Sequence, residues 1–241
     1  MLSELPVELL LSIASYLDYQ GRYHGDVLRL ASSCRACYSL LVPTVYASLD
    51  LTSHFSGRLS LLVHTLACKP ALAQKVRTLS VSHWQKTSDL QNPRYEQEII
   101  LPVLKSVLRP DESLSTWERV LRRYDHVACD AWTALLLSLL PNLQDLVLVI
   151  EKSSGYTIKW MAKVAQEESS TLSKLRNLTI ASDLLHTSGP FSSSHFIPIL
   201  RLPSLRSFCG DMIIDDGTDD EDNALVSTSD LPDNIGYSNV T

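Results

Sequence analysis

Two groups of residues have types and spacings that occur in metal sites or catalytic sites. Cys34 and Cys37 are separated by two residues, the spacing of half a structural zinc site. No second Cys or His pair at ligand spacing follows, and both cysteines fall in a stretch with helical periodicity. Inert, buried thiols explain this pair better than a metal ion. We therefore expect neither a metal site nor a cofactor.

The nearest approach to a catalytic group is His126, which follows Asp125 and lies close to Cys129. Adjacent residues on a helix point in different directions, so closeness in sequence does not assemble a triad. The sequence also lacks a P-loop, a glycine-rich dinucleotide motif, a nucleophile elbow and a zinc-protease motif. We expect a non-catalytic protein. A small-molecule-binding or hydrolytic domain using Asp125 and His126 is the weakest alternative.

Three short helices are predicted for residues 5–42. This stretch contains Cys34 and Cys37 and would determine where they lie. Pro6 suits the first turn of a helix, where its missing N–H is not needed. Asp26 is expected to cap the second helix, and Ser33 a third that ends before Pro43. The first helix places one set of apolar residues on a common face, namely Leu9, Ile13, Tyr16 and Leu17. Such a small unit has a marginal core and more apolar surface than it can bury, so we expect it to need a partner.

Several motifs in this stretch occur in a recognisable order. They are Leu5-Pro6-x-Glu8-Leu9, Ile13 with Tyr16-Leu17, Leu28-x-Leu30 and Cys34-Arg35-x-Cys37-Tyr38. Together they resemble the F-box. The segment Val42-Pro43-Thr44-Val45-Tyr46, with Leu49, is similar to an extension found in fungal F-box proteins. Residues 20–24 depart from the pattern as a small insertion, and an ordinary N-terminal helical hairpin is the alternative interpretation.

The resemblance implies a partner and a set of contact residues. In the F-box family this module binds a Skp1-type adaptor, and through it joins a cullin–RING ubiquitin ligase. Carried over to this sequence, the adaptor-binding residues are Leu5, Pro6, Leu9, Ile13, Leu17, Leu28 and Leu30. The implied function is that of a substrate-recognition adaptor. An assembly subunit that binds the adaptor without ubiquitination remains open.

A second pattern, L-x-x-L-x-L, recurs in the rest of the chain. It occurs at Leu143–Leu148 and Leu175–Ile180, more weakly at Leu205–Phe208, and Val76–Val81 fits the same template. The central positions 79, 146, 178 and 208 are 67, 32 and 30 residues apart. Each of the three later copies follows a similar lead-in, and helical segments separate the copies. This arrangement resembles degenerate leucine-rich repeats, in which strand–helix units stack into a curved solenoid.

The predicted fold is therefore α+β or α/β. It comprises a small three-helix F-box-like module at residues 1–51, an irregular leucine-rich-repeat-like solenoid at 52–210 and an acidic, disordered tail at 211–241. A compact α/β domain is the alternative for the middle region. If the repeats form a curved sheet, its exposed strand residues are expected to bind the target protein. These candidates are Arg77, Ser80, Gln144, Val147, Arg176 and Thr179.

Charge separates the tail from the rest of the chain. The chain has 241 residues and a net charge of −6, yet all 21 Lys and Arg precede residue 207. Residues 1–210 hold 18 of the 27 acids and so carry +3, while residues 211–241 hold nine acids and no base. Such a tail is expected to stay solvated and disordered. No basic patch with interleaved aromatics, membrane span or signal peptide is evident, so we expect no nucleic-acid or membrane partner and a cytoplasmic or nuclear location.

Overall fold

The computed structural model describes residues 5–17, 24–51, 56–81, 95–109, 112–123, 125–150, 155–167, 171–182, 191–211 and 213–214. The predicted tail lies outside this part of the chain from residue 215 onward. The described helices are α1 (Val7–Leu17), α2 (His24–Ser32), α3 (Arg35–Ala47), α4 (Ser56–Cys68), α5 (Pro70–Ala73), α6 (Gln97–Val107), α7 (Leu114–Leu121), α8 (His126–Ser138), α9 (Tyr156–Gln166) and α10 (Ile197–Leu200), with a 3-10 turn at Ser193–His195. The prediction of a mixed helix-and-sheet protein with N-terminal helices is confirmed.

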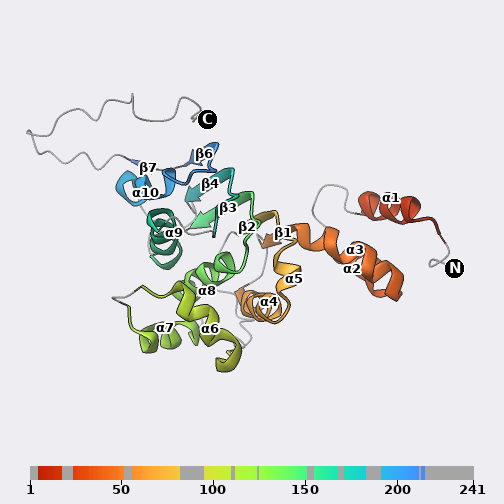
Figure 1. Ribbon diagram of the computed structural model, residues 1–241, viewed down its shortest axis with the longest axis horizontal. Helices are drawn as coiled ribbons and strands as arrows, with labels where there is room; N and C mark the ends of the chain where they lie inside the picture. The colour runs from red at the N-terminus through yellow and green to blue at the C-terminus, as the bar shows by residue number, and fades with distance from the viewer. Residues whose placement is uncertain are drawn as a thin grey trace, which may run out of the picture.

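The main sheet contains five parallel strands in the order β1-β2-β3-β4-β6 (Figure 1). They are β1 (Ser48–Leu51), β2 (Thr78–Val81), β3 (Asp145–Ile150), β4 (Asn177–Ser182) and β6 (Ser207–Gly210). A separate pair is formed by β5 (Phe191–Ser192) and β7 (Ile213–Ile214). Each strand of the main sheet pairs with the next one along the chain, so helices and turns carry the chain from one strand to the next on the same side.

One row of apolar residues crosses the whole sheet in register. Leu79, Leu146, Leu178 and Phe208, the central positions of the sequence motif, are direct neighbours on adjacent strands. Leu49 of β1 continues the row, and it marks a strand that the sequence pattern did not reveal. Because side chains alternate across a strand, this register places the whole row on the face covered by helices.

The strands begin two residues after the first leucine of each motif. Leu143 and Leu175 lie in tight turns before β3 and β4, and both are fully buried. The N–H of Leu143 donates to the carbonyl of Leu140 at 3.4 Å, and the N–H of Leu175 donates to that of Leu172 at 3.0 Å. Leu205 repeats the turn with Leu202 at 3.1 Å. The shared lead-in of the sequence motif is therefore a repeated turn that anchors each strand to the core.

Helix α8 is the centre of the region from residue 52 to residue 210, which we call the body. It packs against α4, α6, α7 and α9, and its residues from Ala128 to Leu137 are buried. A helix surrounded in this way is apolar on all sides. Its one buried carboxylate, Asp130, accepts hydrogen bonds from the N–H of Tyr156 at 2.7 Å and of Thr157 at 3.2 Å. Asp130 thereby satisfies the free N–H groups at the start of α9 and joins the two helices.

Helix α3 differs from its prediction in both of its ends. It continues through Pro43 to Ala47, whereas the sequence predicted an end before Pro43. Proline in a helix interior removes a hydrogen bond and costs about 3 kcal/mol. Leu41 and Val45, buried on either side of it, hold the helix together by packing. The cap is also different, because Cys34 and not Ser33 takes the N-cap position.

The second helix starts earlier than predicted. Helix α2 begins at His24, so Asp26 lies in its first turn and not at the N-cap. Asp26 instead accepts a hydrogen bond from Arg29 at 3.0 Å, one turn further along the helix surface. Within the described residues, none of the helices is long and apolar enough to cross a bilayer.

The register of the sheet predicts unequal effects at neighbouring positions of β3. Leu146→Ala should lower the free energy of unfolding by about 3 kcal/mol, because it leaves a cavity in the closed core. Val147→Ala, on the half-buried opposite face, should cost less than about 1 kcal/mol. Urea unfolding followed by tryptophan fluorescence measures both, since Trp117, Trp132 and Trp160 are buried in the same core. Equal losses for the two variants would contradict the register.

Candidate functional site

The three N-terminal helices share a small core of their own. Helix α1 contributes Leu10 and Ala14, α2 contributes Val27 and Ala31, and α3 supplies the rest, namely Cys37, Leu41 and Val45. The helix starts after Pro6, whose carbonyl accepts hydrogen bonds from the N–H groups of Leu9 at 3.1 Å and Leu10 at 3.2 Å. The core-facing stripe of α1 thus includes Leu10 and Ala14, one helical turn apart.

A second apolar stripe of α1 faces away from this core. Leu9, Ile13 and Tyr16 remain 51%, 38% and 80% exposed. Their spacing of four and three residues places them on one side of the helix, displaced from the buried stripe. Other exposed large apolar residues of the module are Val7, Leu11, Leu28 and Tyr38. Apolar surface this concentrated on one small module indicates a binding site.

The seven predicted adaptor-binding residues fall into two groups. Pro6, Leu9, Ile13 and Leu28 are exposed and accessible to a partner. The other three, Leu5, Leu17 and Leu30, are half-buried and pack against the module core. Tyr16, the most exposed of these apolar side chains, was not selected as a contact residue from the sequence. Its position seven residues after Leu9 was the available signal.

Cys34 and Cys37 have a local structural role. The N–H of Cys37 donates to Sγ of Cys34 at 3.4 Å, which caps the start of α3. Hydrogen bonding from Cys37 lowers the pKa of the Cys34 thiol, and the side-chain contact with Cys34, together with burial, raises the pKa of the Cys37 thiol. Among the described residues, no group of three or more His, Cys, Asp or Glu is arranged to hold a metal ion.

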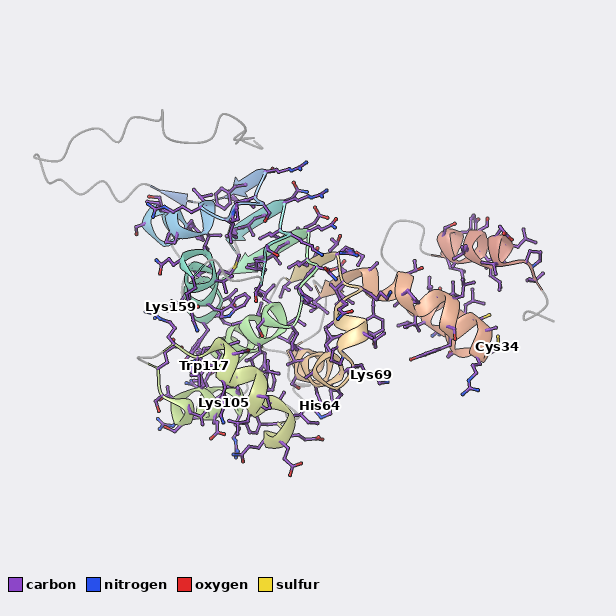
Figure 2. The ribbon with its side chains drawn as sticks, in the orientation of Figure 1. Cys34, His64, Lys69, Lys105, Trp117 and Lys159 are labelled. Atoms are coloured by element: carbon purple, nitrogen blue, oxygen red, sulfur yellow. The ribbon has the colours of Figure 1, made fainter. Side chains whose placement is uncertain are left out.

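The structure places a Cys, a His and a Glu together where the sequence did not suggest it. The Nε2 of His64 lies 2.7 Å from Oε2 of Glu96, and its Nδ1 lies 3.9 Å from Sγ of Cys68. His64 and Cys68 are one turn apart on α4, but Glu96 comes from a segment 32 residues later. The long contact to sulfur makes this a loose arrangement. Figure 2 shows that His64 lies well away from Cys34.

Asp125, the residue of the hydrolytic alternative, acts as a helix cap. Its Oδ1 accepts a hydrogen bond from the N–H of Ala128 at 2.9 Å, and its other oxygen pairs with Arg123. Cys129 is buried in α8, and the side chain of His126 lies outside the described residues. Asp125 is thereby engaged in holding the first turn of α8.

The predicted target-binding residues form two rows across the sheet, one just before the strands begin and one on the face opposite the helices. In the first row, the N–H of Gln144 donates to the carbonyl of Arg77 at 2.7 Å, and that of Arg176 donates to Gln144 at 2.7 Å. In the second, Ser80, Val147 and Thr179 are direct neighbours in the register. All six side chains are exposed or half-buried. Within the described part of the chain, no helix covers this face (Figure 1).

The first row has a further member. The N–H of Arg206 donates to the carbonyl of Arg176 at 2.8 Å, so an exposed arginine extends the row past β4. Sequence reasoning had identified the motif at residues 205–208 but did not select Arg206. Its position after the leading leucine, equivalent to Arg77 and Arg176, was the signal. Between the two rows, Asp145 accepts hydrogen bonds from Thr78 at 3.4 Å and from Asn177.

The two stripes of α1 predict opposite results for adjacent leucines. Leu10→Ser should lower the free energy of unfolding of the helical module by about 3 kcal/mol, because it removes buried apolar surface and buries a hydroxyl. Leu9→Ser, on the outward stripe, should change it by less than about 0.5 kcal/mol. Urea unfolding followed by circular dichroism measures both. A larger loss for Leu9→Ser would mean that the outward stripe is part of the core.

Comparison with known proteins identifies the module. Residues 2–52 match the family model described as F-box-like, a range that contains α1, α2 and α3 together with β1. The search of curated proteins and the search of solved structures each returned no match for this chain. F-box domains are generally non-catalytic adaptors, and they are associated with Skp1 docking in ubiquitin ligase complexes. Residues 2–52 are accordingly an F-box-like domain.

Proposed function

We propose that this chain is a substrate-recognition adaptor of a Skp1–cullin–F-box type ubiquitin ligase. The F-box-like domain docks on a Skp1-type adaptor, and the sheet-containing body holds a target protein. Other subunits transfer ubiquitin. Holding a target lysine close to a charged ubiquitin carrier raises its effective concentration, and this proximity is the contribution of a non-catalytic receptor.

The docking proposal is supported by the distribution of exposed apolar side chains over the described residues. Of the nine exposed large apolar residues in the described part of the chain, seven lie between Val7 and Tyr38. The body, which holds most of the described residues, contributes only Leu61 and Ile197. A surface that is apolar in one module and polar elsewhere favours a permanent partner for that module. We propose Leu9, Ile13 and Leu28 as its central contacts.

The body is proposed as the target-binding part, built as a leucine-rich-repeat-like solenoid, and the F-box is proposed to be of the fungal type. Three features support this: the in-register row of leucines, the repeated turn before each strand, and helices on one side of the sheet. The edge where the strands begin then presents Arg77, Gln144 and Arg176 to the target, and the open face presents Ser80 and Thr179. The proposed division of the chain remains 1–51, 52–210 and 211–241, with β1 linking the first two parts.

The partners of such a receptor follow from its two surfaces. We propose a Skp1-type adaptor, a cullin reached through it and one protein target, with no nucleic-acid or membrane partner. A cytoplasmic or nuclear location is proposed to match. The second candidate is an assembly subunit that keeps the adaptor but has no ubiquitination role, and the exposed stripe of α1 is equally consistent with it.

Adaptor binding should depend on the outward stripe of α1. In a pull-down with a purified Skp1-type adaptor, Leu9→Asp and Ile13→Asp should each weaken binding by about 100-fold or more, because each buries an unpaired charge. Leu61→Asp and Ile197→Asp are matched controls, since both residues are exposed apolar positions outside the module. The control variants should bind like the unaltered chain. Circular dichroism checks that every variant is folded.

Two outcomes would overturn this proposal. One is an unaltered chain that does not bind the adaptor. The other is equal binding by the Leu9→Asp variant and the Leu61→Asp control, which would place the contact elsewhere.

A separate measurement distinguishes the ligase receptor from the assembly subunit. If the chain is a receptor, a cullin should co-purify with it in an adaptor-dependent manner, and the amount should fall at least about tenfold in the Ile13→Asp variant. Quantitative mass spectrometry of the purified complex gives this ratio. Adaptor recovered in normal amount without any cullin would favour the assembly subunit.

A further inference from the structure

The edge of the sheet where the strands begin carries a row of arginines. Arg77, Arg176 and Arg206 each precede a strand, and all three side chains are exposed. Backbone hydrogen bonds of 2.7–2.8 Å through Gln144 link their main chains into one stack. With strands about 4.8 Å apart, the row spans roughly 14 Å from Arg77 to Arg206. In Figure 2, nitrogen-tipped side chains project from this part of the sheet.

Two lysines add to this charge. Lys75 and Lys174 each lie two residues before an arginine of the row, and both are exposed. The ammonium of Lys174 donates to Oδ1 of Asn142 at 2.6 Å, and Arg77 donates to the carbonyl of Asn142 at 3.4 Å. Both of these contacts are to neutral groups. We call the five residues Lys75, Arg77, Lys174, Arg176 and Arg206 the basic edge.

In the described part of the chain, no acid forms an ion pair with a residue of the basic edge. The ion pairs described there are Asp26–Arg29, His64–Glu96 and Arg123–Asp125, none of which involves the edge. Asp145, the acid on the strand between β2 and β4, accepts hydrogen bonds from Thr78 and Asn177. Arg176 and Arg206 immediately precede adjacent strands, and like charges held this close repel each other. An acidic ligand would relieve this repulsion.

The sequence contains a segment of matching charge. Residues 215–222 hold six acids, which are Asp215, Asp216, Asp219, Asp220, Glu221 and Asp222. No Lys or Arg follows Arg206, so these carboxylates have no local basic partner. The remainder of the chain before residue 211 is basic by three charges. The two charge excesses are therefore opposite in sign and separate in sequence.

Chain length lets the acidic segment reach the basic edge. Arg206 and Ile214 are eight residues apart, so their Cα atoms are at most about 28 Å from each other. Asp222 lies eight residues beyond Ile214, so even at that largest separation the far end of the segment can return to Arg206, and a shorter separation lets more of its acids do so. A segment tethered this closely acts at a millimolar effective concentration, well above that of most competing ligands.

We propose that the acidic segment 215–222 binds the basic edge of its own chain. It covers Arg77 and Arg176, two of the residues proposed for target recognition, and a target must displace it. The contact is electrostatic, multivalent and solvent-exposed, so it weakens with salt as the Debye length falls below the spacing of the charges. The binding contact itself is independent of whether the chain serves a ligase.

Zero-length carbodiimide cross-linking of the full chain tests the contact, because the reagent joins a carboxylate to an amine only where they touch. After trypsin digestion, the peptide 207–241 should be joined to peptides containing Lys75 or Lys174. Lys105 and Lys159, exposed on α6 and α9, serve as internal controls. Figure 2 shows both on the helical side of the molecule. Cross-links to the basic edge should exceed those to the controls by about tenfold at low salt.

Charge-removing variants complete the test. The edge variant should lose its cross-links to Lys75 and Lys174 about tenfold, and the control variant with the same net charge should keep them. The edge variant combines Arg77→Gln, Arg176→Gln and Arg206→Gln, and its tail peptide is 202–241 because trypsin no longer cuts after residue 206. The control combines Arg29→Gln, Arg35→Gln and Arg119→Gln, all exposed residues away from the edge.

Three results would overturn the proposal. The first is cross-links spread evenly over Lys75, Lys105, Lys159 and Lys174. The second is an edge variant that cross-links as well as the unaltered chain. The third, in a mixture of isotope-labelled and unlabelled chains, is cross-linking mainly between different copies. None of these results bears on adaptor binding by α1, so failure here is distinguishable from failure of the proposed function.

Discussion

The chain passes from α3 directly into β1, and the placement of the F-box-like domain relative to the sheet depends on this junction. Helix α3 ends at Ala47 and β1 begins at Ser48, without an intervening loop. The carbonyl of Ala47 accepts a hydrogen bond from the N–H of Arg77 at 2.8 Å, so the end of the helix is the first step of the stack that starts every later strand. Tyr46 packs against the core of the module and against the core of the body. The F-box-like domain is therefore joined to the sheet through a short, hydrogen-bonded element.

This joint explains why α3 runs through Pro43. An end before the proline would leave Val45 and Tyr46 outside a helix, and both contribute to packing at the joint. The cost of one missing hydrogen bond is offset by that burial. In a receptor, a direct connection of this kind would hold a target bound on the sheet at a defined distance from the adaptor.

Much of the fold could be predicted because its sheet repeats one residue pattern. Leu79, Leu146 and Leu178 were identified as equivalent from spacing alone, and they are neighbours in the register. The strand at Ser48–Leu51 was missed because Tyr46 stands where the motif has its first leucine, and because Leu49 and Leu51 lie in a segment already assigned to the F-box. The end of α3 was predicted wrongly because local rules place Pro43 outside a helix, and tertiary packing overrides them.

In the candidate sites, too, local sequence patterns predicted some features, and others depended on tertiary packing. Spacing identified Leu9 and Ile13 as belonging to one face, but it could not show that Leu10 and Ala14 form the buried face beside it. That assignment depends on where α2 and α3 lie. His64 and Glu96 are 32 residues apart, so no sequence motif could bring them together. The arginine row was partly predicted, since Arg77 and Arg176 share one motif position, and the structure adds Arg206 through backbone hydrogen bonding.

The exposed side of α1 is the surface on which we propose that the adaptor docks. Hydrogen–deuterium exchange of the full chain, with and without a purified Skp1-type adaptor, tests it most directly. If the adaptor docks there, amide exchange should slow in α1 and α2 on binding and stay unchanged in β2, β3 and β4. Binding accompanied by protection of the strands, with α1 unchanged, would contradict the claim and place the adaptor on the sheet.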